Sequence, residues 1–176
     1  MPTETIRADY LGMPLQVDHL DHENLDYFKH CAQHNFHLQA CDDCKLLRYP
    51  PTTACPWCMS PKSSWKAVEA RGAVHSYTEV HHAIQPAFKA ATPYMVLLVD
   101  LDTQKSKPSE HEALRVMGNL CTPDGKLAPS DMVHKVGIGT RVRMVFSDVV
   151  GGLSIPQWTI DEAAEQPANP WRYPQE

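Results

Sequence analysis

Three features of the sequence predict a mainly β protein, with a short helix and a metal-binding ribbon first and a five-stranded barrel after them. Four cysteines form two CxxC pairs, a helical pattern precedes these pairs, and five strand-like segments follow them. We expect an N-terminal tail at residues 1–18, the helix and ribbon at 19–65, the barrel at 66–160 and a C-terminal tail at 161–176.

The N-terminal segment is too apolar for a solvated leader, and Pro2 and Pro14 discourage a long helix. We therefore expect an ordered tail or a segment that docks on a partner. From His19 to about Asn35 a helix is predicted, because apolar residues recur at three- to five-residue steps. Acidic residues also gather near its start, where the helix dipole favours them.

The two CxxC pairs are Cys41–Cys44 and Cys55–Cys58. Each pair can present two thiolates from one tight turn, and the residues between the pairs suffice to fold back and close a tetrahedral site. The predicted ribbon has short strands at residues 36–40 and 46–49, an exit turn at 60–64 and Trp65 covering the site.

A structural zinc ion bound by four thiolates is the chemistry that this spacing favours. Zn²⁺ displaces the thiol protons, and four ligands saturate its coordination, so the metal would hold the ribbon without acting as a Lewis acid. A rubredoxin-like iron centre and a thiol–disulfide switch are the alternatives. Lys45 and Met59 follow the pairs, at positions where glycine would best suit a left-handed turn.

Five strands are predicted after Trp65, at residues 73–82, 94–101, 114–120, 141–147 and 153–160. The second is nearly all apolar and is expected at the centre of the sheet. The fourth partly alternates, so one of its faces should be buried. Five strands with irregular connections, namely a polar loop at 102–111, a turn at 122–125 and a longer excursion at 126–139, indicate a small Greek-key barrel such as an OB-fold.

Composition argues against several classes of protein. The net charge of −5 at pH 7 argues against a generic nucleic-acid binder. The apolar runs are too short to span a bilayer and residues 1–10 contain no signal-peptide core, so we expect a cytoplasmic location. Thiols stay reduced there, which favours metal over disulfides. Cys31 and Cys121, outside the two pairs, are expected to pack as small buried side chains.

No residue is predicted to be catalytic. The sequence has no recognisable nucleophile motif and no phosphate-binding glycine loop. His75 and His81 would share one strand face with Tyr77 and Glu79, which would permit a His–Glu pair. Histidines on the exposed face of a strand explain this pattern better than an active site does.

A succession of motifs over residues 20–160 resembles the DUF35 family in order and spacing. The motifs are LQACxxC from Leu38, RYPP from Arg48, CPxC from Cys55, GxVxSYT from Gly72, PY at Pro93, the segment Gly137–Arg143 and PQW from Pro156. Departures are the missing glycines after the CxxC pairs, Trp158 where a phenylalanine is usual, and the loops at 102–111 and 122–134. The resemblance implies an N-terminal helix and a rubredoxin-like zinc ribbon before a five-stranded OB-fold.

The resemblance also implies a non-catalytic accessory subunit of a thiolase-like, acyl-CoA-processing complex. Family members serve β-ketothiolysis, acyl transfer or retro-aldol cleavage of acyl-CoA thioesters, and some pair with acyl-CoA hydratases. We expect a hetero-oligomer with two copies of each chain, which binds neither nucleic acid nor membrane. The expected sites are Zn²⁺ at Cys41, Cys44, Cys55 and Cys58, and acyl-CoA or partner contacts at Tyr77, Phe88, Tyr94, Asn119 and Trp158.

Two other functions stay open at this point. Zinc ribbons and OB-folds also serve as single-stranded nucleic-acid modules, although this chain lacks a basic–aromatic stripe. A rubredoxin-like iron protein would carry electrons and would be recognised by its metal content and visible spectrum.

Overall fold

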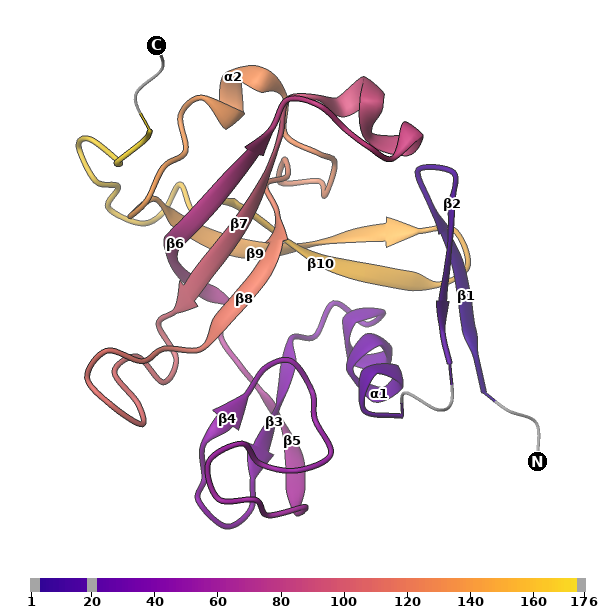
Figure 1. Ribbon diagram of the computed structural model, residues 1–176, viewed down its shortest axis with the longest axis vertical. Coiled ribbons are helices and arrows are strands. Elements are labelled where there is room, and N and C mark those ends of the chain that lie inside the picture. Colours follow the sequence, from indigo (N-terminus) through magenta and orange to yellow (C-terminus); the bar gives the residue numbers. More distant parts are fainter. Residues whose placement is uncertain (1–3, 19–21, 174–176) are drawn as a thin grey trace.

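The computed structural model describes residues 4–18 and 22–173, which form a barrel, a ribbon, a helix between them and an N-terminal hairpin (Figure 1). The helix α1 spans His22–Cys31. The ribbon strands are β3 (His37–Cys41), β4 (Leu47–Arg48) and β5 (Ser63–Ala67). The barrel strands are β6 (Arg71–Val80), β7 (Tyr94–Leu101), β8 (Arg115–Asn119), β9 (Arg141–Val149) and β10 (Leu153–Ile160).

The barrel strands pair in the order β10-β9-β6-β7-β8, with every pair antiparallel. A parallel bridge between Leu120 and Trp158 joins the two ends of this order, and the Cys121 backbone N–H donates to the Trp158 carbonyl over 2.6 Å. The third and fifth barrel strands therefore meet and close the sheet, as in an OB-fold. The predicted mainly β class, with a ribbon before a five-stranded barrel, is confirmed.

The barrel core is formed by every second residue of a strand, because alternate side chains point into the barrel. In β7, which lies between β6 and β8 as predicted, Met95, Leu97, Val99 and Leu101 are buried, and the residues between them are half-buried. Trp158 of β10 is the largest fully buried side chain. It lies against the inner side of β8 at Gly118, where a Cβ atom would come within 2.9 Å of the indole.

The helix α1 connects the ribbon to the barrel (Figure 1). Its buried Tyr27 has ring centroids 6.3 Å from Phe36 and 6.0 Å from Tyr49, both of which belong to the ribbon region. This aromatic cluster explains why a helix of ten residues is stable here, since short helices depend on tertiary packing.

The strand β5 was missed by the sequence interpretation. Ser63 and Ser64 were expected in an exit turn, but they pair with β3. Trp65, expected over the cysteine site, lies opposite Gln39 of β3, and its ring centroid is 5.3 Å from that of His30 in α1. The ribbon order is therefore β4-β3-β5.

The ordered tail expected at the N-terminus is a hairpin of β1 (Ile6–Tyr10) and β2 (Met13–Val17). Leu11 and Gly12 both have positive φ, 55° and 83°, which is the requirement of a type I′ turn. Half-buried apolar residues alternate with exposed residues along both strands. Residues 1–3 and 19–21, at the starts of the predicted tail and helix, and 174–176, at the end of the C-terminal tail, lie outside the described residues.

Two short helices between the predicted strands were also missed, the 3-10 helix η1 (Pro86–Ala91) and α2 (Ser130–Val133). The C-terminal segment docks beside α2. Trp171 exchanges two backbone hydrogen bonds with Ile138, and Arg172 donates to the Val133 carbonyl over 2.6 Å and pairs with Glu79 over 2.6 Å. No helix in the described part of the chain is long and apolar enough to cross a membrane, and the cytoplasmic location stays a prediction.

Candidate metal centre and ligand clefts

The two CxxC turns are built by the same backbone hydrogen bonds. The Lys45 N–H donates to the Cys41 carbonyl over 3.0 Å, and the Cys41 N–H donates to the Leu46 carbonyl over 2.9 Å. The same two bonds recur around Cys55, at 2.9 and 2.8 Å. The two turns thus have the same backbone conformation, and their thiols meet in the space between them.

All four sulfur atoms of the CxxC pairs lie within 4.8 Å of one another. The Sγ atoms of Cys41 and Cys58 are 3.5 Å apart, and those of Cys44 and Cys55 are 3.6 Å apart. Tetrahedral zinc with Zn–S bonds of about 2.3 Å needs S–S separations of about 3.8 Å. The cluster therefore has the size of a metal site, and these four cysteines could hold one metal ion.

The four CxxC thiols interact with one another, so their pKa values shift in opposite directions: the pKa is lowered for Cys41 and Cys55 and raised for Cys44 and Cys58. The backbone N–H of Cys44 lies 3.5 Å from Cys41 Sγ, and this hydrogen bond is the main reason that the pKa of Cys41 is lowered to about 6. Burial instead raises the pKa of Cys31 and of Cys121 to about 12. Both of these are fully buried, as expected, and stay protonated at neutral pH.

A left-handed residue follows each CxxC pair, as the sequence indicated. Lys45 has φ 66° and Met59 has φ 61°. Side chains with a Cβ atom rarely adopt this conformation, so both turns carry backbone strain that glycine would avoid. The two turns thus bring the cysteines together at a cost in conformational free energy at Lys45 and Met59.

Comparisons with known proteins agree with this architecture. The family described as ChsH2, C-terminal OB-fold domain, matches residues 65–147, which run from β5 into β9. A solved chain described as Ltp2-ChsH2(DUF35) aldolase is 30% identical and superposes with a TM-score of 0.61, over 78% of this chain and 94% of that one. This chain belongs to the DUF35 family.

A curated relative of this DUF35 protein is described as a probable enoyl-CoA hydratase alpha subunit, from Thermomonospora curvata. It is 40% identical over 139 residues, which make up 78% of the DUF35 chain. The chain spans 37% of that relative's length.

Two of the contact residues expected from the DUF35 resemblance lie together. Phe88 in η1 and Tyr94 at the start of β7 have ring centroids 5.1 Å apart. Tyr10 of the hairpin, which sequence reasoning did not single out, adds a third ring, 5.9 Å from Phe88. No local signal could have identified it, because the hairpin reaches η1 only in the folded chain.

Asn119 lies at a cleft of about 450 Å³ between the hairpin, α1 and the barrel. We call it the amide cleft, after the side chains of Asn119 and Gln157. Its other lining residues include Tyr10, Tyr27, Phe28 and Met117.

Beyond Tyr10 lies a second cleft, of about 570 Å³, between the hairpin tip, η1 and the β9–β10 turn. We call it the acidic cleft, because its lining includes Asp9, Asp124 and Asp148. Lys126, which also lines it, is held 2.8 Å from Asp124.

Tyr77 and Trp158 lie elsewhere. The Tyr77 hydroxyl accepts the Tyr173 backbone N–H over 2.8 Å, and the Arg172 guanidinium lies 5.5 Å from the centre of its ring, so the C-terminal segment covers it. Trp158 is fully buried inside the barrel. Its side chain packs in the core and presents no surface to a ligand or partner, so we remove it from the expected contacts.

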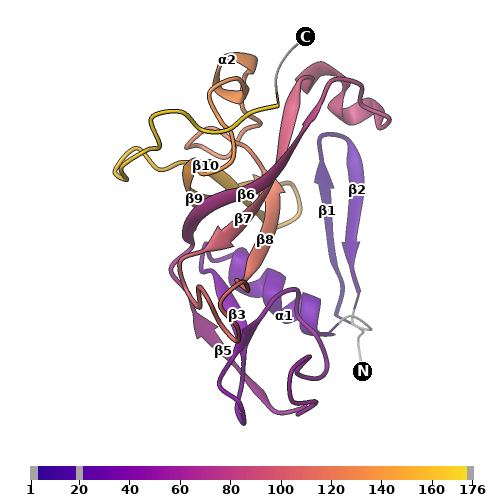
Figure 2. The same ribbon diagram turned by 60° about the vertical axis from the view of Figure 1, so that its left-hand side comes forward.

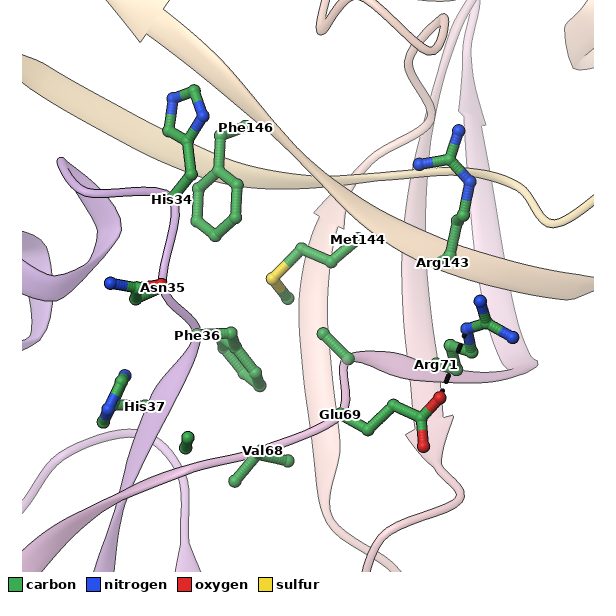
Figure 3. A pocket seen from close by; sticks show the side chains of 12 residues that line it. His34, Asn35, Phe36, His37, Val68, Glu69, Arg71, Arg143, Met144 and Phe146 are labelled. Atoms are coloured by element: carbon green, nitrogen blue, oxygen red, sulfur yellow. Dashed lines mark ion pairs between the residues drawn. The ribbon is translucent and has the colours of Figure 1, made fainter.

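A third cleft, of about 370 Å³, separates the ribbon from the barrel (Figure 3). At its edge the ring of His34 stacks on that of Phe146, with centroids 5.0 Å apart and planes within 2°. His34 Nε2 also lies 2.7 Å from Asp148 Oδ1. Phe36 and Met144 line the opposite sides (Figure 3). These contacts hold the end of the α1 region against β9.

A β-bulge changes the histidine arrangement expected on β6. The register with β7 shifts just after Val74, so His75 is an extra residue and the alternation of faces is reset behind it. His75 Nδ1 lies 3.0 Å from Asp100, whereas His81 Nε2 lies 3.3 Å from Glu79. The expectation that both histidines share one face is therefore wrong, although a His–Glu pair does form.

Proposed function

We propose that this DUF35 chain is a non-catalytic accessory subunit of a thiolase-like complex that processes acyl-CoA thioesters by β-ketothiolysis, acyl transfer or retro-aldol cleavage. The similarity to the solved aldolase chain carries the proposal. It spans 94% of a chain whose description names a DUF35 component together with Ltp2 in one aldolase.

The Thermomonospora curvata relative supports a CoA thioester as the ligand class, because its description is that of an enoyl-CoA hydratase subunit. This chain spans 37% of that relative, so the hydratase activity itself is not transferred. We infer that the acyl-CoA thioester lies at an interface shared with the partner enzyme. Phe88, Tyr94 and Asn119 are the proposed contacts, and Tyr77 would become available if the C-terminal segment moved.

Within this role, we assign structural Zn²⁺ to Cys41, Cys44, Cys55 and Cys58. Four thiolates saturate zinc and leave no position for water or substrate. The metal would join the two CxxC turns, whose sulfur atoms lie together. It would give the ribbon a fixed shape against the barrel and a partner.

Exposed apolar side chains support a protein partner. Trp57 and Met59 project from the second CxxC turn, and Met59 is 74% exposed. Trp171 and Tyr173 are likewise exposed at the C-terminal segment. Aromatic and methionine side chains are enriched at protein interfaces, and we propose that these two surfaces are covered in a complex with two copies of each chain.

Co-expression with a thiolase-like enzyme encoded beside this chain tests the proposal. The two proteins should elute together with the mass of a two-plus-two assembly in size-exclusion chromatography with light scattering. Turnover of acyl-CoA by the partner should depend on this chain. A partner that is fully stable and active alone would refute the accessory role.

A pair of variants tests the proposed surface at the second CxxC turn. Met59→Ser should weaken the assembly because it removes an exposed apolar contact. Ile84→Ser is the matched control, since Ile84 is 89% exposed in the loop before η1, away from the ribbon. Equal effects of the two changes would contradict the assignment of this surface.

A further inference from the structure

The N-terminal hairpin lies on the face that OB-folds use for ligands. That face consists of the second and third barrel strands and the loops after the first and fourth strands. Here these elements are β7, β8, the loop with η1, and the β9–β10 turn. The Asp9 N–H of the hairpin donates to the Val150 carbonyl in this turn over 2.9 Å, and Tyr10 contacts Phe88 of η1. Figure 2 shows the hairpin beside the barrel, between α1 and η1.

The amide cleft beneath this hairpin is chemically neutral. Among the described residues that line it, none is Asp, Glu, Lys, Arg or His. Its walls are mostly aromatic and aliphatic, and its polar groups are uncharged: the amides of Asn119 and Gln157, of which the Gln157 oxygen accepts the Asn119 backbone N–H, and the hydroxyls of its tyrosines. A volume of about 450 Å³ is in the range of small-molecule sites. Such a lining suits an uncharged, mostly apolar group rather than a nucleotide.

Tyr10 lies between the amide cleft and the acidic cleft, because it is a lining residue of both. It is held by Phe88 on one side, with the two rings edge to face. Burial raises the pKa of Tyr10 to about 12, so its hydroxyl is neutral at physiological pH. Tyr10 therefore limits the uncharged amide cleft at the end that lies away from α1.

The acidic cleft would not accept the nucleotide end of CoA. The one lysine among its described lining residues, Lys126, is paired with Asp124, so the negative charge of the cleft comes from Asp9 and from Asp148, whose carboxylate also contacts His34. Negative phosphates would be repelled there. A thioester can therefore extend only its neutral acyl end toward Tyr10, and its CoA moiety must stay outside, on the partner's side.

We propose that the amide cleft binds the acyl group of the CoA thioester and that Tyr10 limits the length of this group. The inference rests on the proposed acyl-CoA function and adds to it a site and a specificity-determining residue. In the native chain, an acyl group that fits the amide cleft would bind. A much longer one would meet the Tyr10 ring and would need the space of the acidic cleft as well.

Binding of two acyl-CoA probes to the full chain tests the inference. Octanoyl-CoA and hexadecanoyl-CoA would be titrated by calorimetry below their micelle concentrations, with free CoA as the reference. The native chain should bind octanoyl-CoA at least tenfold more tightly than hexadecanoyl-CoA or free CoA. Tyr10→Ala joins the two clefts and should remove the preference for the shorter chain. Ile84→Ala, which removes an exposed side chain outside both clefts, should leave it unchanged.

A second variant keeps the inference testable if Tyr10→Ala disrupts the hairpin. Met117 is 58% exposed and lines the amide cleft, so Met117→Trp should fill the cleft without disturbing the core and weaken octanoyl-CoA binding at least tenfold. Ile84→Trp is the matched control and should have no effect.

Several results would overturn the inference. These are equal binding of free CoA and octanoyl-CoA, no saturable binding of either acyl-CoA, an unchanged length preference in a folded Tyr10→Ala chain, or unchanged octanoyl-CoA binding in Met117→Trp. Each of them leaves the accessory role to be decided by co-expression with the partner.

Discussion

Cys41 and Cys58 place their Sγ atoms 3.5 Å apart, although they belong to different turns of the ribbon. Cys44 and Cys55 make the reciprocal contact at 3.6 Å. Each short sulfur–sulfur distance thus crosses between the turns, so a metal at their centre would connect segments that β-sheet pairing alone does not join. Removing one ligand should loosen the ribbon before it affects any chemistry at a distant site.

Cys58→Ser should lower both the zinc content and the stability of the chain. Cys58 is exposed, so serine removes little buried apolar surface, and the loss would report the metal. We expect less than one zinc per chain by elemental analysis and a thermal midpoint lower by more than about 5 °C.

Cys121→Ser provides the comparison for the metal site. It alters a buried thiol outside the cluster and should keep its zinc. Selective loss of turnover in an intact, zinc-loaded Cys58→Ser assembly would contradict the structural role. Iron with a red visible spectrum in the native chain would replace the zinc assignment.

Met59→Gly should stabilise the zinc-loaded chain. The left-handed conformation costs a residue with a Cβ atom about 1–2 kcal/mol, and glycine loses about 0.5–1 kcal/mol more backbone entropy on folding, so the net gain should be about 0.5–1 kcal/mol. Met59→Ala is the matched control, because it removes the same side chain but keeps the strain. Urea unfolding of the two variants measures the difference, and an alanine variant as stable as the glycine variant would argue against strain at this turn.

Much of the fold could be predicted because its information is local. Two strands were predicted with the bounds that the structure shows, β7 at residues 94–101 and β10 at residues 153–160. The spacing of the CxxC pairs likewise specified a four-cysteine cluster. In these cases a short stretch of sequence determines both the conformation and the buried face.

The parts that could not be predicted depend on contacts between distant residues. Pro14 and the short alternation around it concealed the β1–β2 hairpin, whose pairing is completed by a turn with a leucine at positive φ. The bulge at His75 depends on the register with β7. The two clefts exist because Tyr10 meets Phe88, from a different part of the chain. Trp158 was expected as an acyl-CoA or partner contact, but it is buried, because a sequence motif does not give the direction of a side chain.

Asp102 should contribute stability that is lost at acidic pH. The Arg141 guanidinium donates to Asp102 Oδ1 over 2.9 Å, and this hydrogen bond is the main reason that the pKa of Asp102 is lowered. A carboxylate with a lowered pKa in the folded state stabilises it fully above the unfolded pKa of about 3.9, and this contribution disappears as the pH falls through the lower folded value.

Thermal unfolding of native and Asp102→Asn chains between pH 6 and pH 3 measures this contribution. The native chain should be more stable at pH 6, and the difference should shrink below about pH 4. Glu110→Gln removes a carboxylate of the same loop but leaves the Asp102–Arg141 pair intact, and it serves as the control. Since all three chains share the cysteine cluster, metal loss at low pH affects them alike. A difference that stays constant with pH would exclude the ion pair as its cause.

Gly118 and Trp158 should be energetically coupled. The DUF35 resemblance predicts a phenylalanine at position 158, and the larger indole is accommodated because residue 118 has no side chain. A Cβ atom at Gly118 would lie 2.9 Å from Trp158 Cδ1 and 3.3 Å from the Gln157 Cα atom. Gly118→Ala should therefore destabilise the barrel by about 1–3 kcal/mol through overpacking.

A double-mutant cycle separates this contact from a general loss of packing. Trp158→Phe alone should also destabilise the chain, because it leaves a cavity in the core. In the double variant the alanine methyl group can enter the space that the indole vacates, so its destabilisation should be smaller than the sum of the two single changes by at least about 0.5 kcal/mol. Chemical denaturation of the four chains gives this coupling free energy. Strict additivity would mean that the backbone of Gln157, and not the indole, is what excludes a side chain at position 118.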